Sequence, residues 1–121
     1  MKKDSIIKQK SFSFAVKIVS TYKHLSENKK EYVLCKQLLR SGTSIGANVR
    51  EADNAESKSD FIHKMSIAQK ETDETMYWLE LLKESEYLSE KDFESLFSDA
   101  AEILKILRSI ILTTKKNIHH S

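Results

Sequence analysis

The chain has 121 residues, of which 40% are hydrophobic and 31% charged, so it suits one domain with a modest core. It contains two glycines and no proline, residues that supply most turns of sheet proteins, which argues against a β-rich fold. The single cysteine, Cys35, excludes an internal disulfide, and a reducing cytoplasm is the expected location.

Neither a secretory signal nor a membrane span is expected from the sequence. Lys8, Lys10 and Lys17 interrupt every apolar stretch near the amino end. The longest aliphatic run, Ile110-Ile111-Leu112, is far shorter than the roughly 20 residues that cross a bilayer.

The net charge of +2 is distributed unevenly. Residues 1–50 carry 11 Lys/Arg against 3 Asp/Glu, residues 51–104 carry 5 against 15, and residues 105–121 carry 4 against none. Oppositely charged helices that pair within one bundle or between subunits explain this pattern. A basic end that binds an anionic polymer is the other explanation.

Four segments with helical apolar periodicity follow one another, at about residues 8–25, 31–55, 58–85 and 90–116. In the first, an apolar stripe at helical spacing is formed by Phe12, Ala15, Val16, Val19 and Tyr22, and Phe14, Ile18 and Leu25 widen it. Polar residues connect the first two segments. Ser57 with Asp60 and Ser89 with Asp92 resemble capping boxes and predict where the third and fourth helices begin.

Long amphipathic segments joined by short connections predict an all-α fold, an antiparallel up-down four-helix bundle that forms a single domain over residues 1–121. In the third segment, Tyr77 and Trp78 lie beside the apolar seam and are candidates for a protein interface.

Gly42 to Gly46 spells G-x-S-x-G, the nucleophile-elbow pattern of serine hydrolases. That pattern requires a strand before Ser44 and a large α/β sheet, but the preceding residues have a helical period. We therefore expect no catalytic residue and no small-molecule substrate. Di-iron bundles use two Glu-x-x-His motifs, whereas Asp60 to His63 is one loose analogue, so we expect neither a metal nor another cofactor.

Arg40, Ser44, Asn48 and Glu51 share one face of the second helix because their spacing follows the helical repeat. Glu71 and Glu74 of the third helix are expected to approach this polar stripe. An ordinary solvated face is one interpretation, and a polar network at a helix contact, within or between subunits, is the other. The small residues beside the stripe, Gly42, Gly46 and Ala47, predict the close approach of another helix.

If nucleic acid is bound, lysines supply the contacts, and attraction to phosphate carries the binding because no RNA-binding signature accompanies them. The candidate phosphate contacts are Lys8, Lys10, Lys17, Lys29, Lys30, Lys36, Lys115 and Lys116.

Residues 38–52 resemble the four-helix-bundle family encoded by intervening sequences in 23S ribosomal RNA genes. The matching residues are Arg40, Ser44, Ile45, Asn48, Val49 and Glu51, followed in the third helix by Phe61, Ile67, Ala68 and Glu74. Two positions depart from the pattern, since Ala52 replaces a glycine and Lys70-Glu71 replaces Gly-Ser.

This resemblance implies a small bundle that commonly forms pentameric rings and has no enzymatic activity. A related branch, the accessory protein of diversity-generating retroelements, binds nucleic acid and a reverse transcriptase. We therefore expect a homo-oligomer, joined by heterologous contacts between its charge halves, that binds RNA or DNA weakly or scaffolds a nucleic-acid enzyme. A protein-interaction module without nucleic-acid contact is the alternative.

Overall fold

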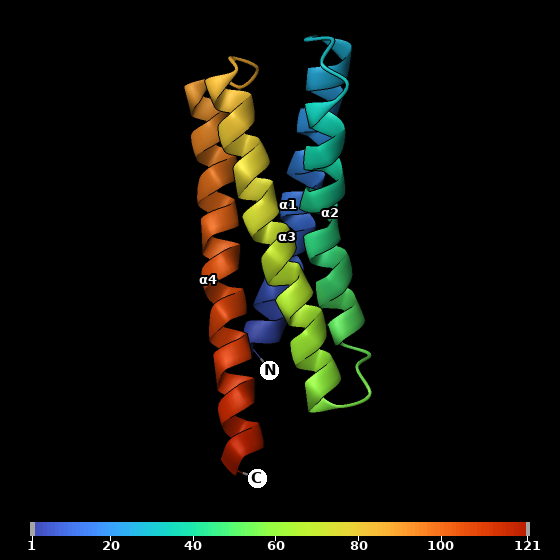
Figure 1. Ribbon diagram of the computed structural model, residues 1–121, viewed down its shortest axis with the longest axis vertical. Helices are drawn as coiled ribbons and strands as arrows, with labels where there is room; N and C mark the ends of the chain where they lie inside the picture. Colours follow the sequence, from blue (N-terminus) through green and yellow to red (C-terminus); the bar gives the residue numbers. More distant parts are fainter. Residues whose placement is uncertain (1, 121) are drawn as a thin grey trace.

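The computed structural model describes residues 2–120, with side chains described for residues 6–117. Its four helices are α1 (Lys2–Glu27), α2 (Leu34–Ala52), α3 (Lys58–Glu84) and α4 (Glu90–His120). The chain runs upward in α1 and α3 and downward in α2 and α4, and the carboxyl end of α4 extends beyond the other helices (Figure 1).

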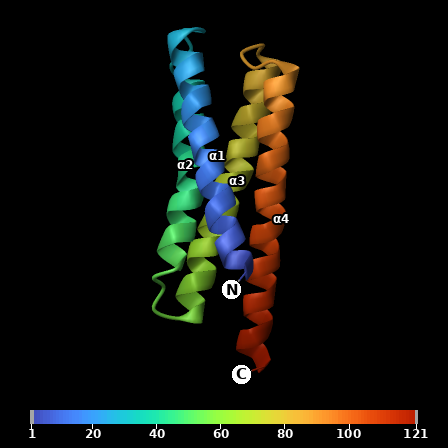
Figure 2. The same cartoon turned by 180° about the vertical axis from the view of Figure 1, so that it is seen from behind.

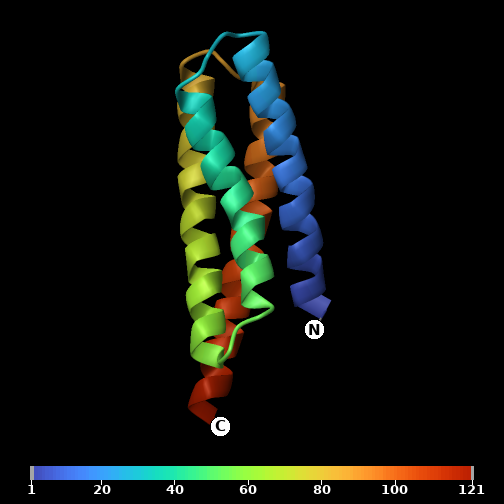
Figure 3. The same ribbon diagram turned by 90° about the vertical axis from the view of Figure 1, so that its right-hand side faces the viewer.

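Each helix packs beside its neighbours in the cycle α1–α2–α3–α4, and the diagonal pairs of the described bundle do not meet. The contact between α1 and α4 is the least extensive of the four. Figure 2 shows α1 on the near face between α2 and α4, and Figure 3 shows two connections at one end and the third at the other. The predicted antiparallel up-down four-helix bundle is confirmed.

In both predicted capping boxes the serine side chain caps its helix. The backbone N–H of Asp60 donates to Ser57 Oγ at 3.0 Å, and that of Asp92 donates to Ser89 Oγ at 3.1 Å. Each serine oxygen thereby satisfies one of the N–H groups that the first turn of a helix leaves unpaired. These local bonds set the beginnings of α3 and α4 at the predicted residues.

The second helix begins at Leu34 instead of residue 31, with Val33 at the N-cap position, and the side chain of Glu31 caps its first turn. The Glu31 carboxylate accepts the backbone N–H groups of Leu34 at 2.9 Å and Cys35 at 2.8 Å, with a third from Val33 at 3.2 Å. Burial by itself would raise the pKa of Glu31, but these backbone hydrogen bonds outweigh it and hold the pKa below its usual range.

Three more helix ends also differ clearly from the prediction. The first helix begins at Lys2 instead of residue 8, and Ile7 in the added segment is fully buried. The second ends at Ala52 instead of residue 55, because the N–H groups of Asp53 and Asn54 bond to carbonyls three residues earlier. The fourth continues to His120 instead of residue 116.

The core contains a different face of α1 from the one that leads the apolar pattern. Phe14 and Ile18 are buried, whereas Phe12, Val16 and Val19 are 59%, 55% and 37% exposed. The residues that widened the predicted stripe, Leu25 included, are therefore the buried ones, together with Ile7 and Ser11. Of the stripe itself, Tyr22 packs partly against the core. Periodicity could not separate these faces, because apolar residues occupy both.

No helix in the described part of the chain is long and apolar enough to cross a membrane.

Candidate interaction surfaces

The polar stripe of α2 is held mainly by bonds to its own backbone. Ser44 Oγ donates to the Arg40 carbonyl at 2.6 Å, and Asn48 Nδ2 donates to the Ser44 carbonyl at 2.8 Å. Hydroxyls in helices often make this bond to the preceding turn. Ser44 thus lies within the continuous helix α2 and not at the strand-to-helix turn that a nucleophile elbow requires.

Across the helix contact, the predicted network is incomplete within one chain. Lys64 of α3 forms an ion pair with Glu51, Nζ to Oε1 3.1 Å. Glu74 instead accepts a bond from Trp78 Nε1 on its own helix at 3.2 Å. No hydrogen bond or ion pair among the described residues joins Glu74 to the α2 stripe, so its predicted role in that stripe stays a prediction.

A buried polar contact between α2 and α3 lies one helical position away from the predicted stripe. The hydroxyls of Thr75 and Ser41 are hydrogen-bonded, with their oxygens 3.0 Å apart, and both residues are almost fully buried. A hydroxyl inside a core needs such a partner, and the pair fixes the register of the two helices. The only sequence signal was hydroxyl residues at core spacing, which does not reveal the partner.

Arg40 acts on Glu71, one of the two carboxylates of the third helix that were expected to approach the polar stripe. Burial raises the pKa of Glu71, and the nearby Glu74 carboxylate raises it further, while Arg40 and Lys70 oppose the shift. The folded protein therefore retains the Glu71 proton more readily than the unfolded chain does.

Replacing Glu71 with glutamine should stabilise the fold at neutral pH. With a raised folded pKa, wild-type stability falls as the pH rises through the folded value, and glutamine removes this loss. The gain should vanish as the pH falls below the ordinary glutamate value of 4.5. Urea unfolding at several pH values measures it. Glu94→Gln, at an exposed site of α4, is the control, and an equal pH-dependent gain there would contradict the assignment.

Of the three small residues, Gly42 leaves the least room for a side chain. A β-carbon at Gly42 would lie 2.8 Å from Ile18 Cγ1 on α1, which is too close for an ordinary contact. At Gly46 the nearest atom, the Ser11 carbonyl oxygen, would be at an ordinary 3.4 Å. Ala47 is exposed on α2. Within one chain, close packing therefore concentrates at Gly42.

An unpartnered apolar stripe runs along the outside of α1. We use "α1 stripe" for Phe12, Val16 and Val19, which follow one another at helical spacing and face away from the core. Two adjoining hollows follow it, of about 390 Å³ against Gly46 and Ala47 of α2 and about 470 Å³ along α1. Both are lined by Phe12 and Ala15, so the exposed apolar surface is continuous and not scattered.

Charged groups border this surface. The Arg50 guanidinium of α2 lies 6.0 Å from the centre of the Phe12 ring, within the range of a cation–π contact. Lys23 lies at the other end of the stripe, lines the same hollow, and forms no ion pair with the described residues. The stripe is thus an apolar centre between two cations.

Three of the eight lysines predicted to contact phosphate form ion pairs with carboxylates of the same chain. Lys8 pairs with Asp53 at 2.6 Å, Lys10 with Glu102 at 2.8 Å, and Lys17 with Asp99 at 2.5 Å. The other five are exposed and form no ion pair with the described residues, and these are Lys29, Lys30, Lys36, Lys115 and Lys116. They gather at the two ends of the bundle and not along one side, because Lys29 to Lys36 span the α1–α2 connection and Lys115 and Lys116 lie near the end of α4.

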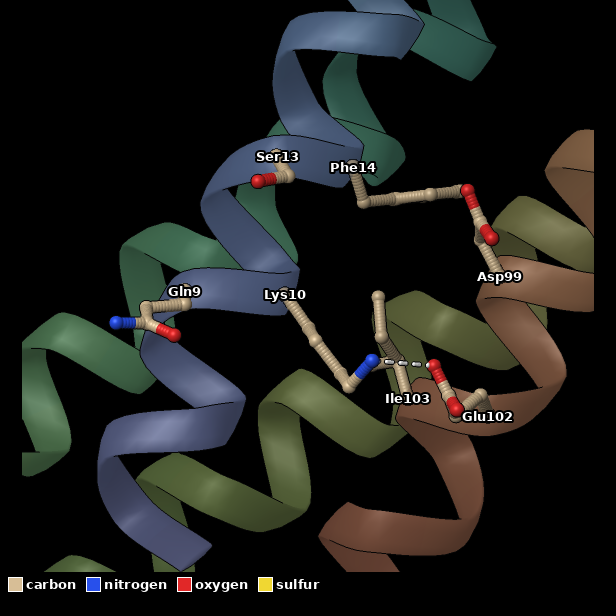
Figure 4. Close-up of a pocket in the computed structure, with 7 residues that line it drawn as sticks. All are labelled: Gln9, Lys10, Ser13, Phe14, Asp99, Glu102 and Ile103. Atoms are coloured by element: carbon tan, nitrogen blue, oxygen red, sulfur yellow. Dashed lines mark ion pairs between the residues drawn. The ribbon is translucent and has the colours of Figure 1, made fainter. Parts of the chain in front are cut away.

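The hollow between α1 and α4 offers little to a small molecule. It measures about 290 Å³, and Phe14 and Ile103 contribute its apolar part (Figure 4). Its charged groups already have partners, since Lys10 reaches across to Glu102 and Asp99 binds Lys17. Among the described residues, no three His, Cys, Asp or Glu side chains are grouped as metal ligands.

Comparison with known proteins agrees with this architecture. The model of the family described as 23S rRNA-intervening sequence protein matches residues 3–109. A crystal structure of a protein of unknown function from the S23 ribosomal protein family of Bacteroides thetaiotaomicron is 56% identical, with a TM-score of 0.89. The match covers 90% of this chain and 97% of that one. No protein of curated function is similar enough to match. The chain belongs to the family of 23S rRNA-intervening sequence proteins.

Proposed function

We propose that this protein is a non-enzymatic bundle that assembles with copies of itself through the α1 stripe. The observation that carries the proposal is the exposure of Phe12, Val16 and Val19 on a helix whose opposite face already fills the core. A contiguous apolar surface of this kind is typical of protein interfaces, because burying it against a partner removes it from water. The resemblance noted in the sequence makes a closed ring the expected form of the assembly.

An aspartate in the α1 stripe should abolish assembly without unfolding the chain. Val16 is 55% exposed, so Val16→Asp places a charge in the proposed interface and leaves the core intact. Multi-angle light scattering after size exclusion should give a multiple of the 14.0 kDa chain mass for wild type and the monomer mass for the variant. Leu112→Asp, on the 57% exposed Leu112 of α4, is the matched control and should assemble normally. A monomeric wild type contradicts the proposal.

A second function, binding to the phosphate backbone of RNA or DNA, is supported by the five lysines that have no internal partner. The family's name links it to ribosomal RNA genes, and a ring would repeat each end of the bundle around its axis. Lysines displayed in this way attract a phosphate backbone without reading its sequence. The alternative remains an interaction module that contacts no nucleic acid.

Two lysine triples test this second function at equal net charge. Replacing Lys29, Lys30 and Lys36 together with alanine should weaken binding to labelled RNA and duplex DNA. The same replacement should also make binding less sensitive to salt, lowering the slope of log affinity against log salt concentration by up to about one per lysine. The same replacement of Lys8, Lys10 and Lys17 should have a smaller effect, because their ammonium groups are engaged by carboxylates. No binding by wild type at low salt favours the interaction module.

A further inference from the structure

A second outward-facing stripe lies on α3, diagonally across the bundle from α1. Asp73, Tyr77, Glu80 and Glu84 follow one another at helical spacing, and all four are exposed. Tyr77 is 58% exposed, and its ring packs edge-on against Trp78 with 5.0 Å between the ring centres. We use "α3 stripe" for these four residues.

The carboxylates of the α3 stripe have no partner of their own. Asp73, Glu80 and Glu84 form no ion pair with any described residue, although five such pairs between other residues are present. The ring of Tyr77 therefore stands among negative charges that the fold leaves uncompensated. This is the counterpart of the α1 stripe, where an apolar centre lies beside Lys23, whose charge also has no partner.

The two stripes match in spacing and chemistry. Phe12, Val16, Val19 and Lys23 follow the intervals four, three and four, and so do the four residues of the α3 stripe. Aligned along parallel helices, the sequences place Phe12 against Asp73, Val16 and Val19 against Tyr77 and Glu80, and Lys23 against Glu84. A tyrosine ring on an apolar surface, bordered by opposite charges, is the composition expected of an interface centre.

The direction of the helices allows this alignment in a closed assembly. The helices α1 and α3 run the same way along the bundle, toward the two connections at one end (Figures 1 and 3). Rotation about an axis parallel to the bundle keeps that direction, so α1 of one copy meets α3 of the next as parallel helices. Because α1 and α3 do not touch, one copy can use both stripes at once. That condition defines a heterologous contact, which closes into a ring when the rotation between copies divides a full turn.

We propose that the α1 stripe of one copy binds the α3 stripe of the next, with Tyr77 seated on Val16 and Val19 and Lys23 facing Glu80 and Glu84. This assignment rests on the proposed self-assembly and adds its second surface. A head-to-tail contact of this kind differs from a symmetric one, in which α1 would meet α1 and α3 would take no part.

Complementation between two blocked variants tests the assignment. Val16→Asp blocks the α1 stripe and Tyr77→Asp blocks the α3 stripe, both at exposed positions, so light scattering should give a monomer for each. Mixed in equal amounts, they should form a dimer of twice the monomer mass and nothing larger. One intact stripe of each kind then remains to pair, while the two aspartate-bearing stripes repel each other. Leu112→Asp should assemble as wild type does.

Other outcomes separate the two proposals. A wild type that stays monomeric overturns self-assembly and this assignment together. A wild type that assembles, with Tyr77→Asp assembling equally, overturns the assignment alone, and so does a mixture that remains monomeric.

Charge exchange gives a second test of the same contact. Lys23→Glu should weaken assembly, and adding Glu80→Lys and Glu84→Lys to the same chain should restore it. A combined variant that assembles more weakly than Lys23→Glu alone overturns the pairing of these side chains.

Discussion

Replacing Phe14 with alanine should lower the free energy of unfolding by about 3–5 kcal/mol, the largest effect we expect from any single truncation in α1. The Phe14 side chain is 1% exposed, and its removal leaves a cavity that the surrounding helices fill only in part. Urea unfolding followed by circular dichroism measures the change. The Val16→Asp background removes any contribution from self-association.

Phe12→Ala is the matched control for this prediction. The same residue type stands two positions earlier on the same helix, but its ring is 59% exposed. In the same background, its truncation should change stability by less than about 1 kcal/mol, as surface substitutions usually do. Equal losses from the two variants would contradict the orientation of α1 in the bundle.

The two glycines of α2 should respond to alanine in opposite directions. At Gly42 the added methyl meets Ile18 at 2.8 Å, and forcing apart a packed contact costs about 1–3 kcal/mol. The better helix propensity of alanine offsets about 1 kcal/mol of that cost, so Gly42→Ala should destabilise by up to about 2 kcal/mol. At Gly46 the contact is ordinary, and Gly46→Ala should stabilise by about 0.5–1 kcal/mol.

Thermal and urea unfolding of the two variants, measured side by side, decide this prediction. Both replacements add one methyl group to the same helix, four residues apart, so propensity effects cancel in the comparison. If Gly42→Ala were the more stable variant, α1 would not approach α2 as closely as the structure places it.

The predictable part of this fold is the part set by short-range chemistry. The absence of proline and the helical apolar spacing identified four helices, and the Ser57 and Ser89 boxes located the beginnings of two of them. Such signals work from sequence because a capping oxygen and its N–H lie within one turn of chain. The capping role of Glu31 was missed. The helical pattern of α2 extends back to this residue, and nothing in the local sequence tells a glutamate that caps a helix from one in its first turn.

The candidate surfaces were less predictable, for a reason visible in α1. Both Phe12 and Phe14 belong to apolar patterns, and no local rule decides which of them a neighbouring helix will cover. Likewise, nothing in the sequence told the lysines of residues 1–50 apart, because each adds one positive charge. The fold divides them into Lys8, Lys10 and Lys17, which meet carboxylates of distant segments, and others that do not.

The sequence by itself therefore determined the helices, their order, the bundle and the family, because propensity, capping and amphipathic spacing act within a few residues of chain. Only the tertiary structure decided which face of α1 is buried, that Ile18 leaves no room for a side chain at Gly42, and which charges remain without a partner. Each of these depends on how the helices rotate about their axes when they pack. That rotation minimises exposed apolar area over all four helices at once, and no single helix encodes it.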